Sequence, residues 1–207
     1  MSWKRSPIDY IIGKRRRDAV EDIGRYYSDF TGRCFDNYAT RSEPNQFTAW
    51  DVVAVSALSV QIPAQAAIAL IDDAVPNAPA GRLGELLACI PSDATIWDEQ
   101  DYLAGAEARE LWALVKSLPN LARTKTSKLL AAKRPRLFPV YDRYIGQALL
   151  VDQNADDWPL WRGLFMEQGS GLLDACDSVA RDAGVPGGLS PLRVLDVAIW
   201  MSEAPQR

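Results

Sequence analysis

The sequence predicts an all-α protein of about nine or ten helices, and two observations carry this prediction. Apolar residues recur at three- and four-residue intervals along most of the chain, beginning with Ile8, Ile11 and Ile12, and no stretch shows the alternation typical of strands. Helix start signals also punctuate the chain, at Thr48-Ala49-Trp50-Asp51 and at Ser190-Pro191. These signals place helices from one end of the sequence to the other.

The first 46 residues are expected to form an N-terminal helix, residues 7–29, and a polar connecting arm. Four cations in a row, residues 14–17, lie on the middle of this helix. Such a run is either a solvated helix face or an accessory arm that contacts phosphate.

Residues 47–205 are expected to form one helical domain, built as two small lobes or as a single unit. Its first helix, residues 51–60, should end before Pro63, because a proline disfavours helix at the residue that precedes it. The remaining expected helices are residues 64–74, 83–90, 106–118, 124–132, 141–151, 158–166, 172–182 and 192–201.

Composition excludes several kinds of chemistry and points to a cytoplasmic location. The chain has no histidine, which removes Ser-His-Asp and Cys-His catalysis and the usual zinc ligand sets. Its three cysteines, Cys34, Cys89 and Cys176, lie too far apart for a clustered metal or iron–sulfur site. We therefore expect no cofactor and no metal. The N-terminus does not fit a signal peptide and no apolar run reaches about eighteen residues, so we expect no membrane association.

A cationic strip, residues 116–147, stands out against a chain whose net charge is −4. Asp142 is the only acid in this strip. Its cations are Lys116, Arg123, Lys125, Lys128, Lys133, Arg134, Arg136 and Arg143. Positive charge gathered in one segment of an acidic protein indicates a polyanionic partner.

The middle of the strip has the layout of a helix-hairpin-helix. One helix ends at Leu118-Pro119, Asn120-Leu121-Ala122 turns, and a second helix starts near Thr124. Such a turn directs backbone N–H groups at a phosphate, where the helix dipole also favours an anion. Lys125 and Lys128 would add point charges there.

These motifs resemble the helix-hairpin-helix DNA glycosylases of the endonuclease-III-like superfamily, over roughly residues 47–149. The hairpin corresponds to residues 118–122, and Phe138-Pro139-Val140-Tyr141-Asp142 corresponds to the loop that opens the next helix. The resemblance implies that Asp142 is the catalytic carboxylate, facing the sugar of a flipped nucleotide. It also implies that Gln61, in Leu58-Ser59-Val60-Gln61, enters the base stack. The run from Lys133 to Asp142 is similar, too, to a bacterial family of unknown function.

Three positions depart from the glycosylase pattern. Asn120 and Ala122 replace the two hairpin glycines, and an alanine in the left-handed region would cost about 1 kcal/mol or more. Thr124 falls where bifunctional members carry a lysine nucleophile, and a threonine cannot form a Schiff base. A glycosylase of this kind would lack lyase activity and would rely on Asp142.

Alternative interpretations accompany the main candidates. Asp142 can equally be the N-cap of the helix that follows it. The basic loop Lys133-Arg134-Pro135-Arg136 can be solvated, and Gln61 can simply end a helix. Tyr141 and Tyr144 can stack on a base or belong to the core.

The sequence thus favours binding of double-stranded DNA, with phosphate contacts through the hairpin. A monofunctional N-glycosylase, a non-catalytic DNA-binding module and a protein-interaction partner are the three hypotheses. The candidate catalytic residues are Asp142 and Thr124. The candidate nucleic-acid-binding residues are Gln61, Asn120, Leu121, Ala122, Arg123, Lys125, Lys128, Lys133, Arg134, Arg136, Tyr141 and Arg143.

Overall fold

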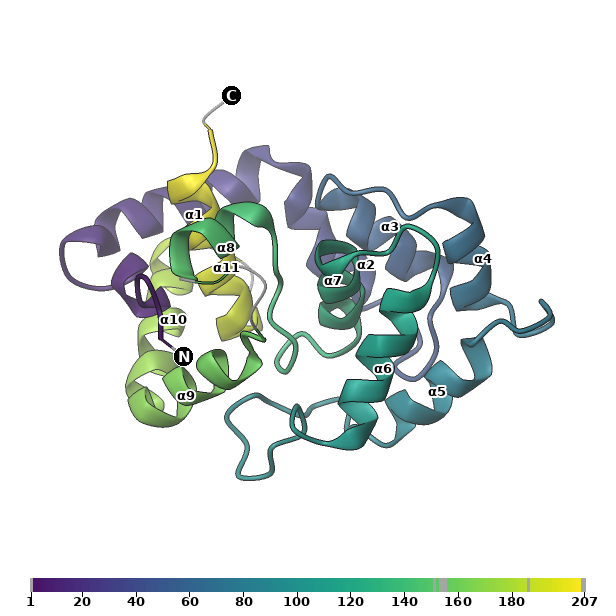
Figure 1. The fold of residues 1–207 in the computed structure, drawn as a ribbon. Helices are drawn as coiled ribbons and strands as arrows, with labels where there is room; N and C mark the ends of the chain where they lie inside the picture. The colour runs from purple at the N-terminus through teal and green to yellow at the C-terminus, as the bar shows by residue number, and fades with distance from the viewer. Residues whose placement is uncertain (1, 151, 153–155, 186, 206–207) are drawn as a thin grey trace. The chain divides into compact units, whose positions relative to one another are not determined.

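The computed structural model describes residues 2–150, 152, 156–185 and 187–205. Within these ranges the chain forms eleven α-helices and three short 3-10 helices (Figure 1). No strand occurs among the described residues, where the one β-like feature is an isolated bridge between Trp3 and Leu150. The all-α prediction is confirmed. None of the described helices has the length and apolar character that a membrane crossing requires.

The helices fall into two compact units. The terminal unit combines residues 1–30 with residues 139–207, and the central unit is residues 31–138. The terminal unit contains α1 (Arg16–Asp29), α8 (Arg143–Leu149), α9 (Trp158–Gln168), α10 (Ser170–Asp182) and α11 (Pro191–Glu203), with 3-10 helices at Pro7–Tyr10 and Gly13–Arg15. The central unit contains α2 (Cys34–Ala39), α3 (Ala49–Ala57), α4 (Ala64–Ile71), α5 (Ala80–Ala88), α6 (Ala106–Ser117) and α7 (Arg123–Lys133), with a 3-10 helix at Thr31–Arg33.

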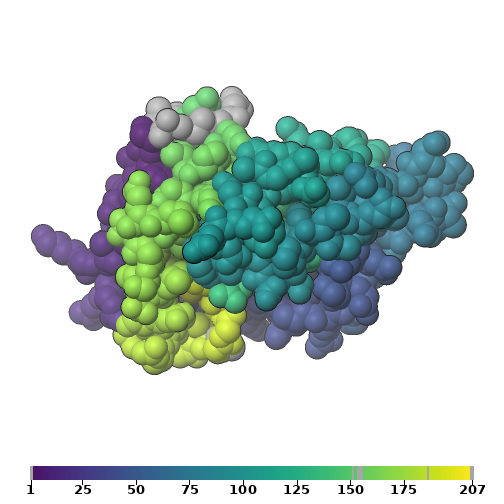
Figure 2. Space-filling view, turned by 90° about the horizontal axis from the view of Figure 1, so that it is seen from below, coloured from purple at the N-terminus to yellow at the C-terminus, as the bar shows by residue number. Residues whose placement is uncertain are grey.

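The terminal unit is built around α11, which packs on α1, α8 and α10. Pro191 occupies the first turn of α11, where a missing N–H costs nothing, and almost every residue from there to Ile199 is buried. Arg193 and Asp196 form an ion pair inside this unit, and the Arg193 guanidinium also donates to the Tyr26 hydroxyl of α1 at 2.7 Å. Figure 2 shows the N-terminal residues, in purple, beside the C-terminal helices, in yellow-green.

The first helix is shorter than the sequence predicts. Residues 7–15 contain two 3-10 helices rather than part of one long α-helix, and Gly13, the first residue of the second 3-10 helix, has a φ of +57°. A residue in the left-handed region cannot continue a right-handed helix, so the break falls there. The helix predicted over residues 141–151 likewise ends at Leu149, and Val151 lies outside the described residues.

The central unit is organised around α7, which packs on α2, α3 and α6. Every residue of α7 from Thr126 to Lys133 is buried, although this stretch includes two cations, Lys128 and Lys133. This helix is therefore a core element of its unit along most of its length. Only its first turn, from Arg123 to Lys125, is partly exposed.

The predicted start of α3 is confirmed as a capping box. The Thr48 side chain accepts from the backbone N–H of Trp50, and the Asp51 carboxylate accepts from the backbone N–H of Thr48 at 2.7 Å. The helix stops at Ala57, and a turn follows in which Ser59 has a φ of +60°. Residues 58–63 are therefore not helical, and they connect α3 to α4.

Candidate nucleic-acid interface

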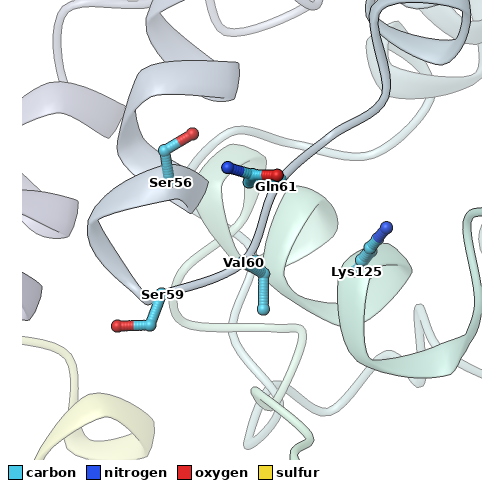
Figure 3. A pocket seen from close by; sticks show the side chains of 5 residues that line it. All are labelled: Ser56, Ser59, Val60, Gln61 and Lys125. Carbon is cyan, nitrogen blue, oxygen red and sulfur yellow. The ribbon is translucent and has the colours of Figure 1, made fainter.

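An open pocket of about 590 Å³ lies in the central unit, between the end of α3 and the start of α7. Ser56 of α3, Ser59, Val60 and Gln61 of the following turn, and Lys125 of α7 line it (Figure 3). Gln61 and Lys125, 64 positions apart in the sequence, are both predicted contact residues. Tertiary packing brings these two to one pocket.

The two helices and the short turn that the sequence predicts here are present beside this pocket, since α6 ends at Ser117 and α7 begins at Arg123. Asn120 adopts a φ of +58°, so the residue that replaces the first hairpin glycine does take up the left-handed region that asparagine tolerates. Ala122 has a φ of −93° and ψ of 178°. This extended backbone suits any residue, so the expected cost of an alanine at the second glycine position does not arise.

The first turn of α7 is the polar, partly exposed end of an otherwise buried helix. Ala122 is its N-cap residue and supplies no side-chain hydrogen bond to the first turn. The positive end of the helix dipole lies at this turn, where Arg123, Thr124 and Lys125 are all half-buried, and Lys125 lines the pocket. Leu121 is buried and anchors the turn, with its backbone N–H donating to Leu118 O at 3.1 Å. This end of α7 combines two cations with a hydroxyl.

The pocket contains a strained residue, which sequence reasoning missed. Ser59 is not a glycine, yet it is held at positive φ, a conformation that costs on the order of 1 kcal/mol. Ser59 lies within the Leu58-Ser59-Val60-Gln61 motif, so its position was visible in the sequence, but its conformation was not. Strained backbone at a pocket is a common property of functional sites.

Lys128 was predicted to contact phosphate, and the structure places it elsewhere. Its side chain is buried, and its Nζ atom donates to the backbone oxygen of Leu58 at 3.2 Å. One helical turn after Lys125, it thus fixes the turn that carries Ser59 and Gln61. The role of Lys128 in this structure is to position the pocket wall.

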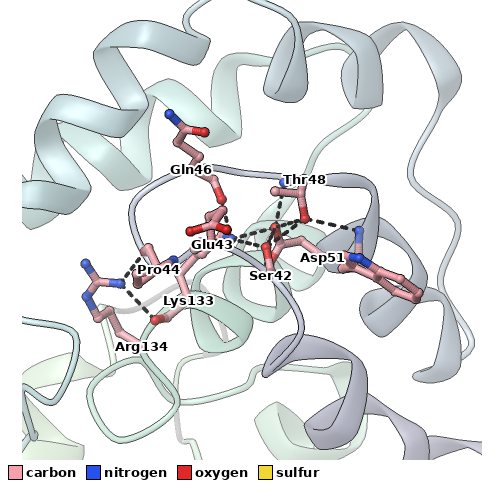
Figure 4. A network of polar contacts seen from close by, with 9 residues as sticks. Ser42, Glu43, Pro44, Gln46, Thr48, Asp51, Lys133 and Arg134 are labelled. Atoms are coloured by element: carbon pink, nitrogen blue, oxygen red, sulfur yellow. Dashed lines mark hydrogen bonds and ion pairs between the residues drawn. The ribbon is translucent and has the colours of Figure 1, made fainter.

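Lys133 and Arg134, predicted to form part of a basic loop, are buried inside the central unit. The Lys133 Nζ atom lies 2.6 Å from Asp51 Oδ2 and donates to the Ser42 hydroxyl at 2.6 Å and to Glu43 O at 2.8 Å (Figure 4). An ammonium shared among a carboxylate, a hydroxyl and backbone oxygens is fully engaged. Lys133 is therefore not a free base for the adjacent Ser42, and it is not available to a phosphate.

Arg134 is fully enclosed, and backbone oxygens accept most of its hydrogen bonds. Its acceptors are the backbone oxygens of Pro44, Leu87, Ile90 and Lys133 and the amide oxygen of Asn45. Burial lowers the pKa of Arg134 to about 10, and burial also lowers the pKa of Lys133 against the opposing effect of Asp51. Both interpretations of Lys133 and Arg134, as part of a solvated loop or as phosphate contacts, are therefore wrong.

Arg136 and Arg143, the last two arginines of the strip, are exposed. The Arg136 guanidinium lies over the Trp97 ring, 5.2 Å from its centroid, within the central unit. Arg143 lies over the Tyr144 ring in the terminal unit and donates to its hydroxyl at 2.8 Å. Both guanidinium groups are oriented by an aromatic ring and keep their charge at the surface.

Asp142 belongs to the terminal unit, whereas the hairpin belongs to the central unit. Its Oδ1 atom accepts from the backbone N–H groups of Tyr144 at 2.9 Å and Ile145 at 3.0 Å, so the N-cap interpretation of this half-buried residue is confirmed. Tyr141 is buried, with its ring against Gly146. A core position, rather than an exposed stacking surface, describes Tyr141.

The chain belongs to the family of unknown function DUF6308, which matches residues 19–203. This match covers the whole central unit, most of the terminal unit and the whole cationic strip. No curated protein and no solved structure matches the chain.

Proposed function

We propose that this chain is a DNA-binding protein of the helix-hairpin-helix type, with its contact surface at the pocket and the first turn of α7. The observation that carries this proposal is the meeting of Gln61 and Lys125 at one open pocket. Lys125 and Arg123 supply positive charge, the positive end of the α7 dipole favours an anion, and Gln61 supplies an amide that pairs with base edges.

The small number of exposed cations in the strip fits contact with a DNA backbone. Of the strip's cations, Lys128, Lys133 and Arg134 are committed to internal partners. The strip's other cations in the central unit are exposed or half-buried: Lys116, Arg123, Lys125 and Arg136. A surface with few phosphate contacts binds DNA with modest, salt-dependent affinity.

The test is binding of a fluorescently labelled DNA duplex, measured by anisotropy at several salt concentrations. We expect log Kd to change linearly with log salt, with a slope of about 0.9 per phosphate neutralised. Lys125→Glu should weaken binding to all duplex sequences and reduce the slope by about 1. Arg181→Glu, which changes the charge of an exposed side chain at the end of α10 by the same amount, is the matched control.

Two results would contradict the proposal. One is an affinity that does not respond to salt, and the other is a Lys125→Glu variant that binds as the control does. Circular dichroism of each variant establishes that the helices are intact before the affinities are compared.

Base excision by Asp142 is the second candidate function. The Asp142 Oδ1 atom accepts both cap hydrogen bonds, so its Oδ2 atom lies outside the cap. A carboxylate held in a fixed orientation with one oxygen outside the cap can stabilise an oxocarbenium-like charge or activate a water molecule. Release of a free base from damaged or modified duplex DNA tests this activity.

A further inference from the structure

A stacked aromatic pair lies at the surface of the central unit, at the opposite end of α3 from the pocket. The rings of Tyr38 on α2 and Trp50 on α3 lie 5.8 Å apart between centroids, with 10° between their planes. Trp50 is 41% exposed, which is unusual for the largest aromatic side chain in a protein that has enough core to bury it. Internal packing alone does not account for this exposure.

Arg41 completes the cluster without covering it. Its guanidinium carbon lies 5.2 Å from the centroid of Tyr38 and 5.2 Å from the centroid of Trp50. An arginine on the outer face of Trp50 would be far more distant from Tyr38, so equal distances place Arg41 beside the stack. The guanidinium therefore adds positive charge next to the rings and does not occupy the outer face of Trp50.

An exposed row of α3 connects this cluster to the pocket. Trp50, Val53 and Ser56 follow one another at three-residue intervals, all three are exposed, and Ser56 lines the pocket. With a rise of 1.5 Å per residue, Trp50 lies about 9 Å along the helix axis from Ser56. Each three-residue step also turns the row by about 60° around the helix axis, so a strand held at the pocket would meet the Trp50 ring by following this row over a few nucleotides.

We propose that Trp50, Tyr38 and Arg41 form a stacking site for an unpaired nucleobase of the DNA held at the pocket. This inference rests on the proposed function. A planar aromatic face binds any base by stacking, and an adjacent arginine stabilises both the base and the neighbouring phosphate.

The experiment compares a short duplex that carries one unpaired thymine with the fully paired duplex of the same sequence. Anisotropy gives both affinities for the wild type and for Trp50→Ala, Trp50→Phe and Ile68→Ala. Ile68 on α4 is 52% exposed and is the matched control for loss of an exposed apolar side chain. Thermal unfolding of each variant shows that the fold is retained.

We expect tighter binding of the duplex with the unpaired base, and we expect Trp50→Ala to lose this preference by roughly 5- to 150-fold, the range measured for stacked bases. Trp50→Phe should keep part of it, and Ile68→Ala should keep all of it. The unpaired base should also quench tryptophan fluorescence in the wild type and in Ile68→Ala but in neither Trp50 variant, since both Trp50 substitutions remove the stacking indole and leave the other six of the seven tryptophans in place.

Two outcomes would overturn the inference. If both duplexes bind equally and Trp50→Ala behaves as Ile68→Ala does, the stacking site is wrong while DNA binding stands. If neither duplex binds, the proposed function fails and this inference fails with it.

Discussion

The Lys133 Nζ atom lies 2.6 Å from the Asp51 Oδ2 atom, and the side chains of the two residues are 1% and 0% exposed. The same carboxylate oxygen accepts the backbone N–H of Thr48 and so caps α3. One buried ion pair therefore joins the last turn of α7 to the first turn of α3. A buried charge is tolerated in a protein interior only when it is paired in this way.

Breaking this ion pair should unfold the protein more easily. Lys133→Met keeps most of the side-chain volume but leaves the Asp51 carboxylate buried without its counter-ion, which typically costs about 3–5 kcal/mol. Urea denaturation measures the free energy of unfolding. Lys125→Met, at a partly exposed position on the same helix, should stay within about 0.5 kcal/mol of the wild type. Equal effects of the two substitutions would show that the pair does not stabilise the fold.

Two substitutions distinguish the helix-capping role of Asp142 from its proposed catalytic role. Asparagine caps a helix about as well as aspartate, so Asp142→Asn should leave stability nearly unchanged, while Asp142→Ala should cost about 1 kcal/mol. If the carboxylate performs base excision, Asp142→Asn should abolish release of free base from a panel of damaged duplexes without weakening duplex binding. A wild type that releases no base from any substrate in the panel would rule out the glycosylase.

Two helical glycines should respond in opposite directions to alanine. A Cβ atom at Gly146 of α8 would lie 2.5 Å from the Tyr141 hydroxyl and 2.8 Å from its ring, whereas a Cβ at Gly163 of α9 meets nothing within 4 Å. Gly146→Ala should therefore destabilise the protein by about 1–3 kcal/mol through overpacking. Gly163→Ala should stabilise it by up to about 1 kcal/mol, since alanine favours helix. Thermal or urea unfolding of both variants checks the pair, and a stabilising Gly146→Ala would contradict the described packing of Tyr141.

The environment of Tyr10 predicts that the free energy of unfolding falls at alkaline pH. Its ring is buried and its hydroxyl donates to Glu203 at 2.7 Å; burial, with this hydrogen bond to a carboxylate, raises the pKa of Tyr10 from 10 to about 12. The folded state therefore holds a proton that the unfolded chain releases first. This contribution is fully present below pH 10 and is lost as the pH rises to about 12.

The measurement is the free energy of unfolding of the wild type and of Tyr10→Phe, from neutral pH to about pH 12. The wild type should be the more stable of the two at neutral pH, and the difference should shrink as the pH rises above 10. Since phenylalanine has no proton to lose, a difference that is constant over this range would refute the described environment of Tyr10.

The sequence predicts secondary structure well where local chemistry decides it. The capping box at Thr48, the hairpin turn between α6 and α7 and the start of α11 at Pro191 all lie where the residues indicate. The helix predicted to run to residue 60 instead ends at Ala57. The failures are also local in cause. The left-handed conformation of Gly13 splits the first predicted helix. A glycine adopts positive and negative φ about equally readily, so its presence in the sequence does not show which one it takes.

The candidate interface could be predicted only in part. Gln61, Arg123 and Lys125 follow from the hairpin and from the resemblance, and the structure gathers Gln61 and Lys125 at one pocket. In the sequence, Trp50 is only part of a helix start signal, and Tyr38 lies within the predicted connecting arm. Their stacking depends on how α2 packs on α3, which is a property of the folded unit.

The sequence alone determined the fold class, the approximate positions of the helices other than α2, the exclusion of histidine chemistry and the location of the cationic strip. Only the tertiary structure decided what each cation in that strip does. Lys125, Lys128 and Lys133 look alike in sequence, yet one lines an open pocket, one donates to Leu58 and one is buried against Asp51. The physical reason is that a lysine stays solvated unless distant residues enclose it and pair with it. For Lys133 these residues lie in the segment from Ser42 to Asp51, more than eighty positions away, and only folding brings that segment to α7.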